Sequence, residues 1–131
     1  MKHLLRLLAF GFCLFALGCS KGPTAEEQAS LAAKGYYDHL LAGEYDHFME
    51  GKYGFDTINA SYREQLTANA KQFVALQKDK HRGIREVRVS NARMDTAVNV
   101  MQVFMVFCYG DSTNEEVLVP MVEHQGRWQM R

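Results

Sequence analysis

The hydrophobic pattern of the chain changes its period at Ile84, and this change constrains the fold more than any other feature. Before Ile84, apolar residues recur every three or four positions, which is typical of amphipathic helices. After it, Val87 and Val89 alternate with polar neighbours, and a valine-rich strand pattern runs over 96–109. Helices followed by consecutive strands predict an α+β fold, with N-terminal helices packed on a curved antiparallel β-sheet.

The first half of the chain is expected to hold three helices. Thr24-x-x-Glu27 has the spacing of a capping box, in which the two side chains satisfy free backbone N–H groups at a helix start. We expect the first helix to begin there and to end at Gly43, which can adopt a left-handed cap conformation. A short helix is expected over 44–51, followed by a brief strand or an irregular link over 55–58.

The third expected helix is the longest. Ser61-x-x-Glu64 repeats the capping-box spacing, and the apolar period continues to about Lys80. Gly83 follows and predicts the end of the helix. We expect the sheet to curl over this long helix.

The last two strands are short. An apolar run predicts a strand over 117–122, and the turn 124–126 leads to a final strand over 127–130. Pro120 lies inside the first of these strands and cannot donate a ladder hydrogen bond, so it predicts an edge strand or a bulge.

Length and charge limit the class of protein. The chain has 131 residues, which is enough for one core, and 15 basic residues balance 15 acidic ones. Hydrophobic residues make up 47% of the chain, an ordinary value for a folded domain. The balanced charge gives no basic surface for nucleic acid, so we expect no nucleic-acid partner.

The N-terminus combines a positive leader with an apolar run. Lys2 and Arg6 precede the apolar stretch 7–17, which is too short to span a bilayer because a spanning helix needs about 20 residues. A stretch of this length fits the apolar region of a secretory signal peptide. The stretch is followed by Gly18-Cys19, a small residue before cysteine, which resembles the lipobox of bacterial lipoproteins.

The lipobox resemblance implies a signal peptide over 1–18, a tether over 19–23 and a single domain over 24–131. It implies that the Cys19 thiol carries acyl chains such as palmitate, and each buried CH₂ group adds about 0.8 kcal/mol of membrane affinity. We expect a lipid-anchored protein of the bacterial cell envelope. Ser20 is not Asp, so an inner-membrane retention signal is absent, and we expect the outer membrane in a Gram-negative source.

A second resemblance rests on motifs in the strand-rich half. They are Gly83-Ile84, Thr96-Ala97-Val98-x-Val100, Tyr109-Gly110-Asp111, Glu116-Val117-x-Val119-Pro120-Met121-Val122 and Gly126-Arg127-Trp128. With the order of elements, they resemble bacterial lipoproteins of unassigned function in the nuclear-transport-factor-2-like (NTF2-like) superfamily, some of which carry a lumazine-binding label. This resemblance covers about 25–131 and implies the cone-like, cystatin-like fold of ketosteroid isomerase, with a cavity between sheet and helices.

Aromatic residues supply the candidate pocket, whose expected lining is Tyr36, Tyr37, Tyr45, Tyr62, Phe104 and Trp128. We favour a non-enzymatic role, in which the domain binds a small apolar or aromatic ligand or a partner protein. Isomerases and dehydratases of the resembled fold use a cavity carboxylate or histidine with tyrosine hydroxyls, so such an enzyme is the first alternative. Helical spacing directs Asp38 and His39 away from the apolar face, which disfavours them as cavity acid and base. A structural envelope protein that forms a homodimer through its sheet is the second alternative.

Neither a metal site nor a cofactor site is expected. His39 and His47 are eight positions apart, His81 and His124 are isolated, and the sequence contains no CxxC pair. No nucleotide-binding glycine loop occurs either. Cys108 is the one thiol left after signal cleavage and acylation, and its place in an apolar strand predicts a small buried hydrophobic residue.

Overall fold

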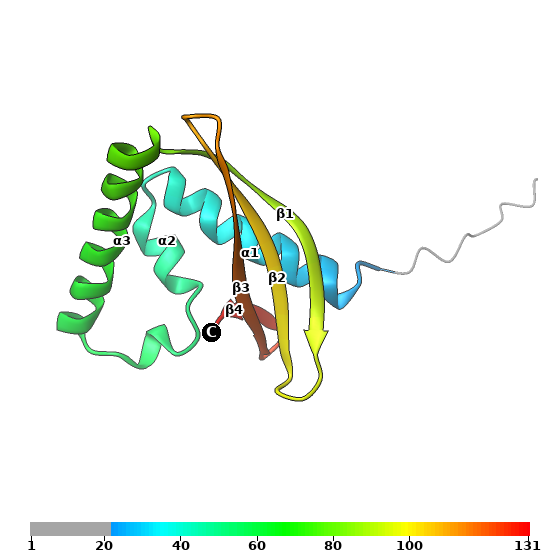
Figure 1. Ribbon diagram of the computed structural model, residues 1–131. Helices are drawn as coiled ribbons and strands as arrows, with labels where there is room; N and C mark the ends of the chain where they lie inside the picture. The colour runs from blue at the N-terminus through cyan, green and yellow to red at the C-terminus, as the bar shows by residue number, and fades with distance from the viewer. Residues whose placement is uncertain (1–21) are drawn as a thin grey trace, which may run out of the picture.

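The computed structural model describes residues 22–131, so the predictions on Cys19 and on the 1–18 segment lie outside the described residues. In this part of the chain, helices precede a four-stranded antiparallel meander with the strand order β1-β2-β3-β4 (Figure 1). The elements are α1 (Ala25–Leu41), α2 (Tyr45–Glu50), the 3₁₀ helix η1 (Phe55–Thr57), α3 (Ala60–His81), β1 (Ile84–Asp95), β2 (Val100–Tyr109), β3 (Asn114–His124) and β4 (Arg127–Met130). Among residues 22–131 there is no helix of the length and apolarity needed to span a membrane. The predicted α+β class is confirmed.

Helix α1 lies across one face of the curved sheet and forms the core with it (Figure 1). Its contact face carries Ala29 and Ala33, both fully buried. Small side chains let the helix backbone approach the strands closely, and the space is filled from the sheet side by Met101, Met105 and Met121, which are also fully buried. Flexible thioethers fill irregular gaps in a core, so the methionines adapt the sheet to the helix.

The prediction that the sheet curls over the longest helix is wrong, because α1 occupies that place. Helix α3 stands beside the sheet in Figure 1 and buries one residue, Ala70. Leu66, Phe73 and Val74 pack partly against the core. The other faces of α3 are rich in charged and amide side chains, so its apolar stripe is too narrow to cover a sheet.

Helix ends follow local capping chemistry, with one correction. The Thr24 hydroxyl accepts a hydrogen bond from the Glu27 N–H at 3.2 Å, as the capping-box spacing predicts. Helix α3 begins earlier than predicted, because the Asn59 side chain caps it by accepting from the Tyr62 N–H at 2.8 Å. At its other end, Arg82 has a φ of 60° and adopts the left-handed cap conformation.

Strand β2 is an inner strand with apolar residues on both faces. Val103 pairs with Ala92 on β1 and with Val119 on β3, and these residues face α1. Successive side chains of a strand point to opposite faces, so the next residue, Phe104, and its partner Leu118 lie on the outer face of the sheet. The strand begins at Val100 rather than at the predicted residue 96, because 96–99 form a turn.

The expectation that Pro120 marks an edge is confirmed locally, because β4 pairs only with Met121–His124 of β3 and leaves the edge of β3 open at Pro120. Strand β3 lies between β2 and β4, and Pro120 pairs with Gln102 in a regular register. Strand β4 ends at Met130, and the Pro120 carbonyl accepts a hydrogen bond from Arg131 N–H beyond that end. The proline nitrogen therefore faces the place where the neighbouring strand has stopped, and the ladder loses no regular donor.

Candidate functional site

An apolar cavity of about 400 Å³ lies between α1, α2, α3 and the inner face of the sheet. Helix α2 lies between α1 and α3 (Figure 1), and the cavity is lined by all three helices and by β2 and β3. The lining residues are Tyr37, Leu40, Phe48, Met49, Lys52, Leu66, Asn69, Ala70, Phe73, Phe107 and Val117. The cavity therefore has an aromatic wall and few polar groups, a composition typical of small-molecule sites.

Tyr37 joins the helical and sheet walls of this cavity. Its ring contacts Phe48 edge-on at a centroid distance of 5.4 Å and Phe107 at 5.5 Å. Phe107 contacts Phe73 of α3 at 6.4 Å, so the aromatic contacts continue to the outermost helix. Burial raises the pKa of the Tyr37 hydroxyl, which keeps it protonated and able to donate a hydrogen bond at neutral pH.

Lys52 stands where this cavity meets the turn after α2. The backbone around it extends the sheet: Tyr53 N–H donates to the Met130 carbonyl at 2.7 Å, and Met130 N–H donates to the Gly51 carbonyl at 2.7 Å. These bonds fix Lys52 against β4. Its Nζ lies 5.3 Å from the centroid of the Phe48 ring, and burial lowers the pKa of the ammonium group.

Of the six predicted pocket residues, Tyr37 alone lines this cavity. Tyr36 lies on the adjacent face of α1, where its hydroxyl donates to the Trp128 carbonyl at 2.7 Å and its ring covers Gly51. Trp128 is buried in the core, and its Nε1 donates to the Gln28 side chain at 3.4 Å. Tyr36 and Trp128 therefore close the sheet edge instead of forming a cavity wall.

The other three predicted residues also lie outside this cavity. The Lys71 Nζ atom lies 5.6 Å from the centroid of the Tyr45 ring, and Tyr62 is 52% exposed. Phe104 is on the outer face of the sheet, where the Arg93 guanidinium lies 5.5 Å from its ring centroid. The six residues do not form one pocket, because the alternation of β2 and the helical spacing of α1 send them to different faces.

The acidic and histidine side chains of α1 also lie outside the cavity. Asp38 pairs with Lys34 at 2.8 Å, and His39 lies 3.2 Å from the Glu44 carboxylate. Their side chains are 51% and 42% exposed. Helical spacing predicted this outward direction. Within residues 22–131 no group of three or more His, Cys, Asp or Glu side chains could hold a metal ion.

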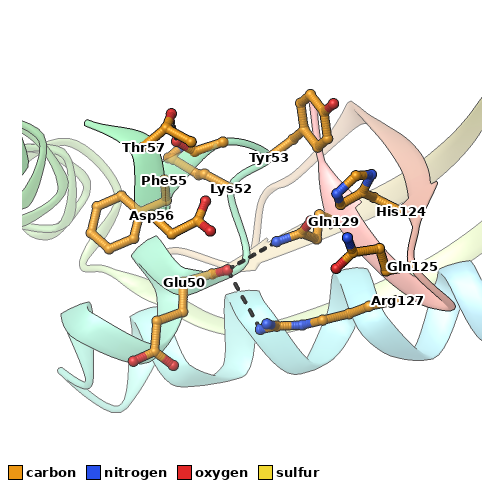
Figure 2. A pocket seen from close by; sticks show the side chains of 11 residues that line it. Glu50, Lys52, Tyr53, Phe55, Asp56, Thr57, His124, Gln125, Arg127 and Gln129 are labelled. Atoms are coloured by element: carbon orange, nitrogen blue, oxygen red, sulfur yellow. Dashed lines mark hydrogen bonds between the residues drawn. The ribbon is translucent and has the colours of Figure 1, made fainter.

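A second, polar pocket of about 540 Å³ lies between the turn after α2 and the β3–β4 hairpin (Figure 2). Arg127 and Gln129 reach across it and donate to the Glu50 carbonyl at 3.5 and 3.4 Å, while the Glu50 carboxylate points away. The ring of Tyr53 contacts His124 edge-on at 5.4 Å. Opposite charges and amides are mixed in this lining, so it has no single chemical preference.

Sequence analysis missed every lining residue of the cavity except Tyr37, including Phe48, Lys52, Phe73 and Phe107. Phe73 belongs to the apolar stripe of α3, and this stripe was the one available signal for it. Lys52 lies in a turn between two glycines, where no periodic pattern shows the direction of a side chain.

No family model matches the sequence, and a comparison with curated proteins finds no match. The fold is similar to a crystal structure from Campylobacter jejuni, of a protein provisionally described as an NTF2-like transpeptidase. The TM-score is 0.59 at 12% sequence identity, and the match covers 75% of this chain and 92% of the other. The expected NTF2-like cone fold is thereby confirmed.

Proposed function

We propose that this chain is a lipid-anchored binding protein of the bacterial cell envelope, whose cone domain holds a small apolar or aromatic ligand. The aromatic-lined cavity carries the proposal. Its volume of about 400 Å³ lies in the range of small-molecule sites, which is roughly 300–1,000 Å³. It sits between helices and the inner face of the sheet, where the NTF2-like resemblance implies a binding cavity.

A non-enzymatic role is favoured over acid–base catalysis. The lining contains neither a carboxylate nor an imidazole, and a base within hydrogen-bond reach of the substrate is what isomerase chemistry requires. Of the two neighbours of Tyr37, Asp38 forms a surface ion pair with Lys34, and the His39 ring lies 3.2 Å from the Glu44 carboxylate. The proposal needs no cofactor, because the apolar walls themselves supply the binding energy.

The cavity can be tested by filling it from helix α3. Ala70 is buried and lines the cavity, whereas Ala68 on the same helix is exposed. Isothermal titration with octan-1-ol, on the full chain in nanodiscs with empty nanodiscs as reference, measures apolar binding. Ala70→Phe should abolish binding and Ala68→Phe should preserve it. Equal octanol binding by the two folded variants would place the ligand site elsewhere.

The proposed anchor is the Cys19 thiol, which stands shortly before the first residue of α1. Several acyl chains there would hold the domain at a membrane without a spanning helix. Radiolabelled palmitate should enter the wild-type protein and the Cys13→Ala variant, since Cys13 lies within the expected signal peptide. Cys19→Ala should take up no label, and incorporation into that variant would refute the anchor.

A homodimer through the sheet is the second candidate, and the outer sheet face favours it. That face carries the apolar side chains of Phe104, Val106, Leu118 and Val122, and Leu118 is 50% exposed. Leu118→Glu should convert a dimer to a monomer in native mass spectrometry. Leu31→Glu is the matched control, because Leu31 is 69% exposed on α1. A wild-type protein that is monomeric at all concentrations would exclude this candidate.

A further inference from the structure

We propose that the cavity selects a monoanionic ligand, an organic carboxylate with an apolar chain or ring, and that Lys52 binds its head group. This inference rests on the proposed binding role of the cavity and adds the chemical class of its ligand. It is carried by the place of one cation in an otherwise apolar lining.

Lys52 is the one residue of the cavity lining with a basic side chain, and the lining has no acidic side chain. The remaining polar groups are the Asn69 amide and the Tyr37 hydroxyl, and both can donate hydrogen bonds to an oxygen anion. An anionic head group therefore finds a cation and neutral donors, while an ammonium head group would be repelled by Lys52. A single positive charge matches a monoanion.

The ammonium group of Lys52 has no counter-ion among the described residues. None of the ion pairs within residues 22–131 involves it. Lys52 also lines the polar pocket, together with Glu50 and Asp56. Neither carboxylate forms an ion pair with it, and the Glu50 carboxylate lies 3.6 Å from His47. Nζ lies over the face of the Phe48 ring, which compensates the charge only partly.

Burial lowers the pKa of Lys52 because the charged form loses hydration at this site. A carboxylate bound beside Nζ would replace the lost hydration with a charge-assisted hydrogen bond, which is shorter and stronger than a bond between neutral groups. The apolar part of the ligand would then contact Phe73, Phe107 and Val117, which lie on the two facing walls. Head and tail are thus accommodated by different parts of one cavity.

Three probes with the same tail separate these contributions. Octanoate, octan-1-ol and octylammonium are titrated into the full chain in nanodiscs, with empty nanodiscs as reference. Octanoate should bind about tenfold more tightly than octanol, and octylammonium more weakly than octanol, since tenfold is the usual scale of one charge-assisted contact. Lys52→Met, which keeps the length of the side chain, should reduce the octanoate advantage to less than twofold.

Two further variants act as controls. Lys52→Arg retains the cation and should retain the preference for octanoate. Lys71→Met removes a lysine of α3 that lies outside the cavity lining and over the ring of Tyr45, and it should leave the preference unchanged.

The outcomes distinguish this inference from the proposed function. Equal binding of octanoate and octanol to the wild type would overturn the choice of an anionic ligand and leave the apolar binding role intact. An octanoate advantage that survives in Lys52→Met would overturn the role of Lys52. Failure of all three probes to bind would overturn the cavity as a ligand site.

Discussion

Gly51 lacks a side chain at a point where the domain has no room for one. A Cβ atom built there would lie 2.5 Å from the Cδ1 and Cγ atoms of the Tyr36 ring, far inside van der Waals contact. That ring cannot move away freely, because its hydroxyl is bonded to the Trp128 carbonyl. Gly51→Ala should therefore lower the free energy of unfolding by about 1–3 kcal/mol, the usual cost of overpacking, as measured by urea denaturation.

Gly35 is the matched control for Gly51. It lies within α1, and a Cβ atom there would meet nothing within 4 Å. Alanine favours the helical state by up to about 1 kcal/mol relative to glycine, so Gly35→Ala should leave the protein as stable or more stable. A Gly51→Ala variant that is no less stable than Gly35→Ala would show that the Tyr36 ring can move aside without lowering the free energy of unfolding.

Asp111 should make the free energy of unfolding of the domain depend on pH in the acidic range. Hydrogen bonds from Thr113 and from His81, 2.9 Å away, lower the pKa of its carboxyl from 3.8 to about 2. Because the folded state holds the charged form more strongly, this contribution is complete above about pH 4 and is lost as the pH falls through about 2.

Urea unfolding between pH 5 and pH 2 measures this dependence. The stability difference between the wild type and Asp111→Asn should shrink as the pH falls, since the variant has no carboxyl to protonate. A difference that stays constant over this range would show that the charge of Asp111 does not stabilise the folded state.

At the scale of elements, α3 is held less firmly against the core than α1. It buries Ala70 alone, whereas α1 buries Ala29, Ala33 and Leu40 against the sheet. Segments with few buried apolar contacts open locally at a lower free energy than the core. In hydrogen–deuterium exchange, backbone amides in the middle of α3 should exchange faster than those of β2. Equal protection of the two elements would contradict this ranking.

The mobility expected of α3 bears on the cavity, because Leu66, Ala70 and Phe73 form one of its walls. A ligand that bridges this wall and the sheet would stabilise the attached state of the helix. Octanoate at saturating concentration should therefore slow amide exchange in α3 more than in β1, which does not line the cavity. Uniform slowing over both elements would point to a site elsewhere.

Local chemistry explains which elements could be predicted from the sequence. The Thr24 cap and the turn at Gln125-Gly126 depend on neighbouring residues, and both are found where the sequence predicts them. The packing partner of the sheet depends on contacts distant in sequence, and length alone wrongly favoured α3. Phe104 was misplaced for a related reason: β2 is apolar on both faces, so its sequence does not show which face is the inner one.

At the scale of the whole molecule, the two ends of the described chain depend on one another. The buried Trp128 on the last strand receives a hydrogen bond at its carbonyl from Tyr36 of the first helix. The last strand is also bonded to Gly51 and Tyr53 through Met130. Closure of this edge therefore requires the final residues, and the core spans almost the whole described chain.

This closure predicts that 22–131 folds by itself as one cooperative unit. The fragment contains the complete core and one buried free thiol, Cys108, so it needs no disulfide. Circular dichroism should show a single urea transition that is unchanged by dithiothreitol. The shorter fragment 22–126 lacks Trp128 and Met130, whose loss opens the core at the edge of the sheet, and it should give no cooperative transition. A cooperative transition in the shorter fragment would mean that α1 and the first three strands suffice, and that β4 only covers an already stable core.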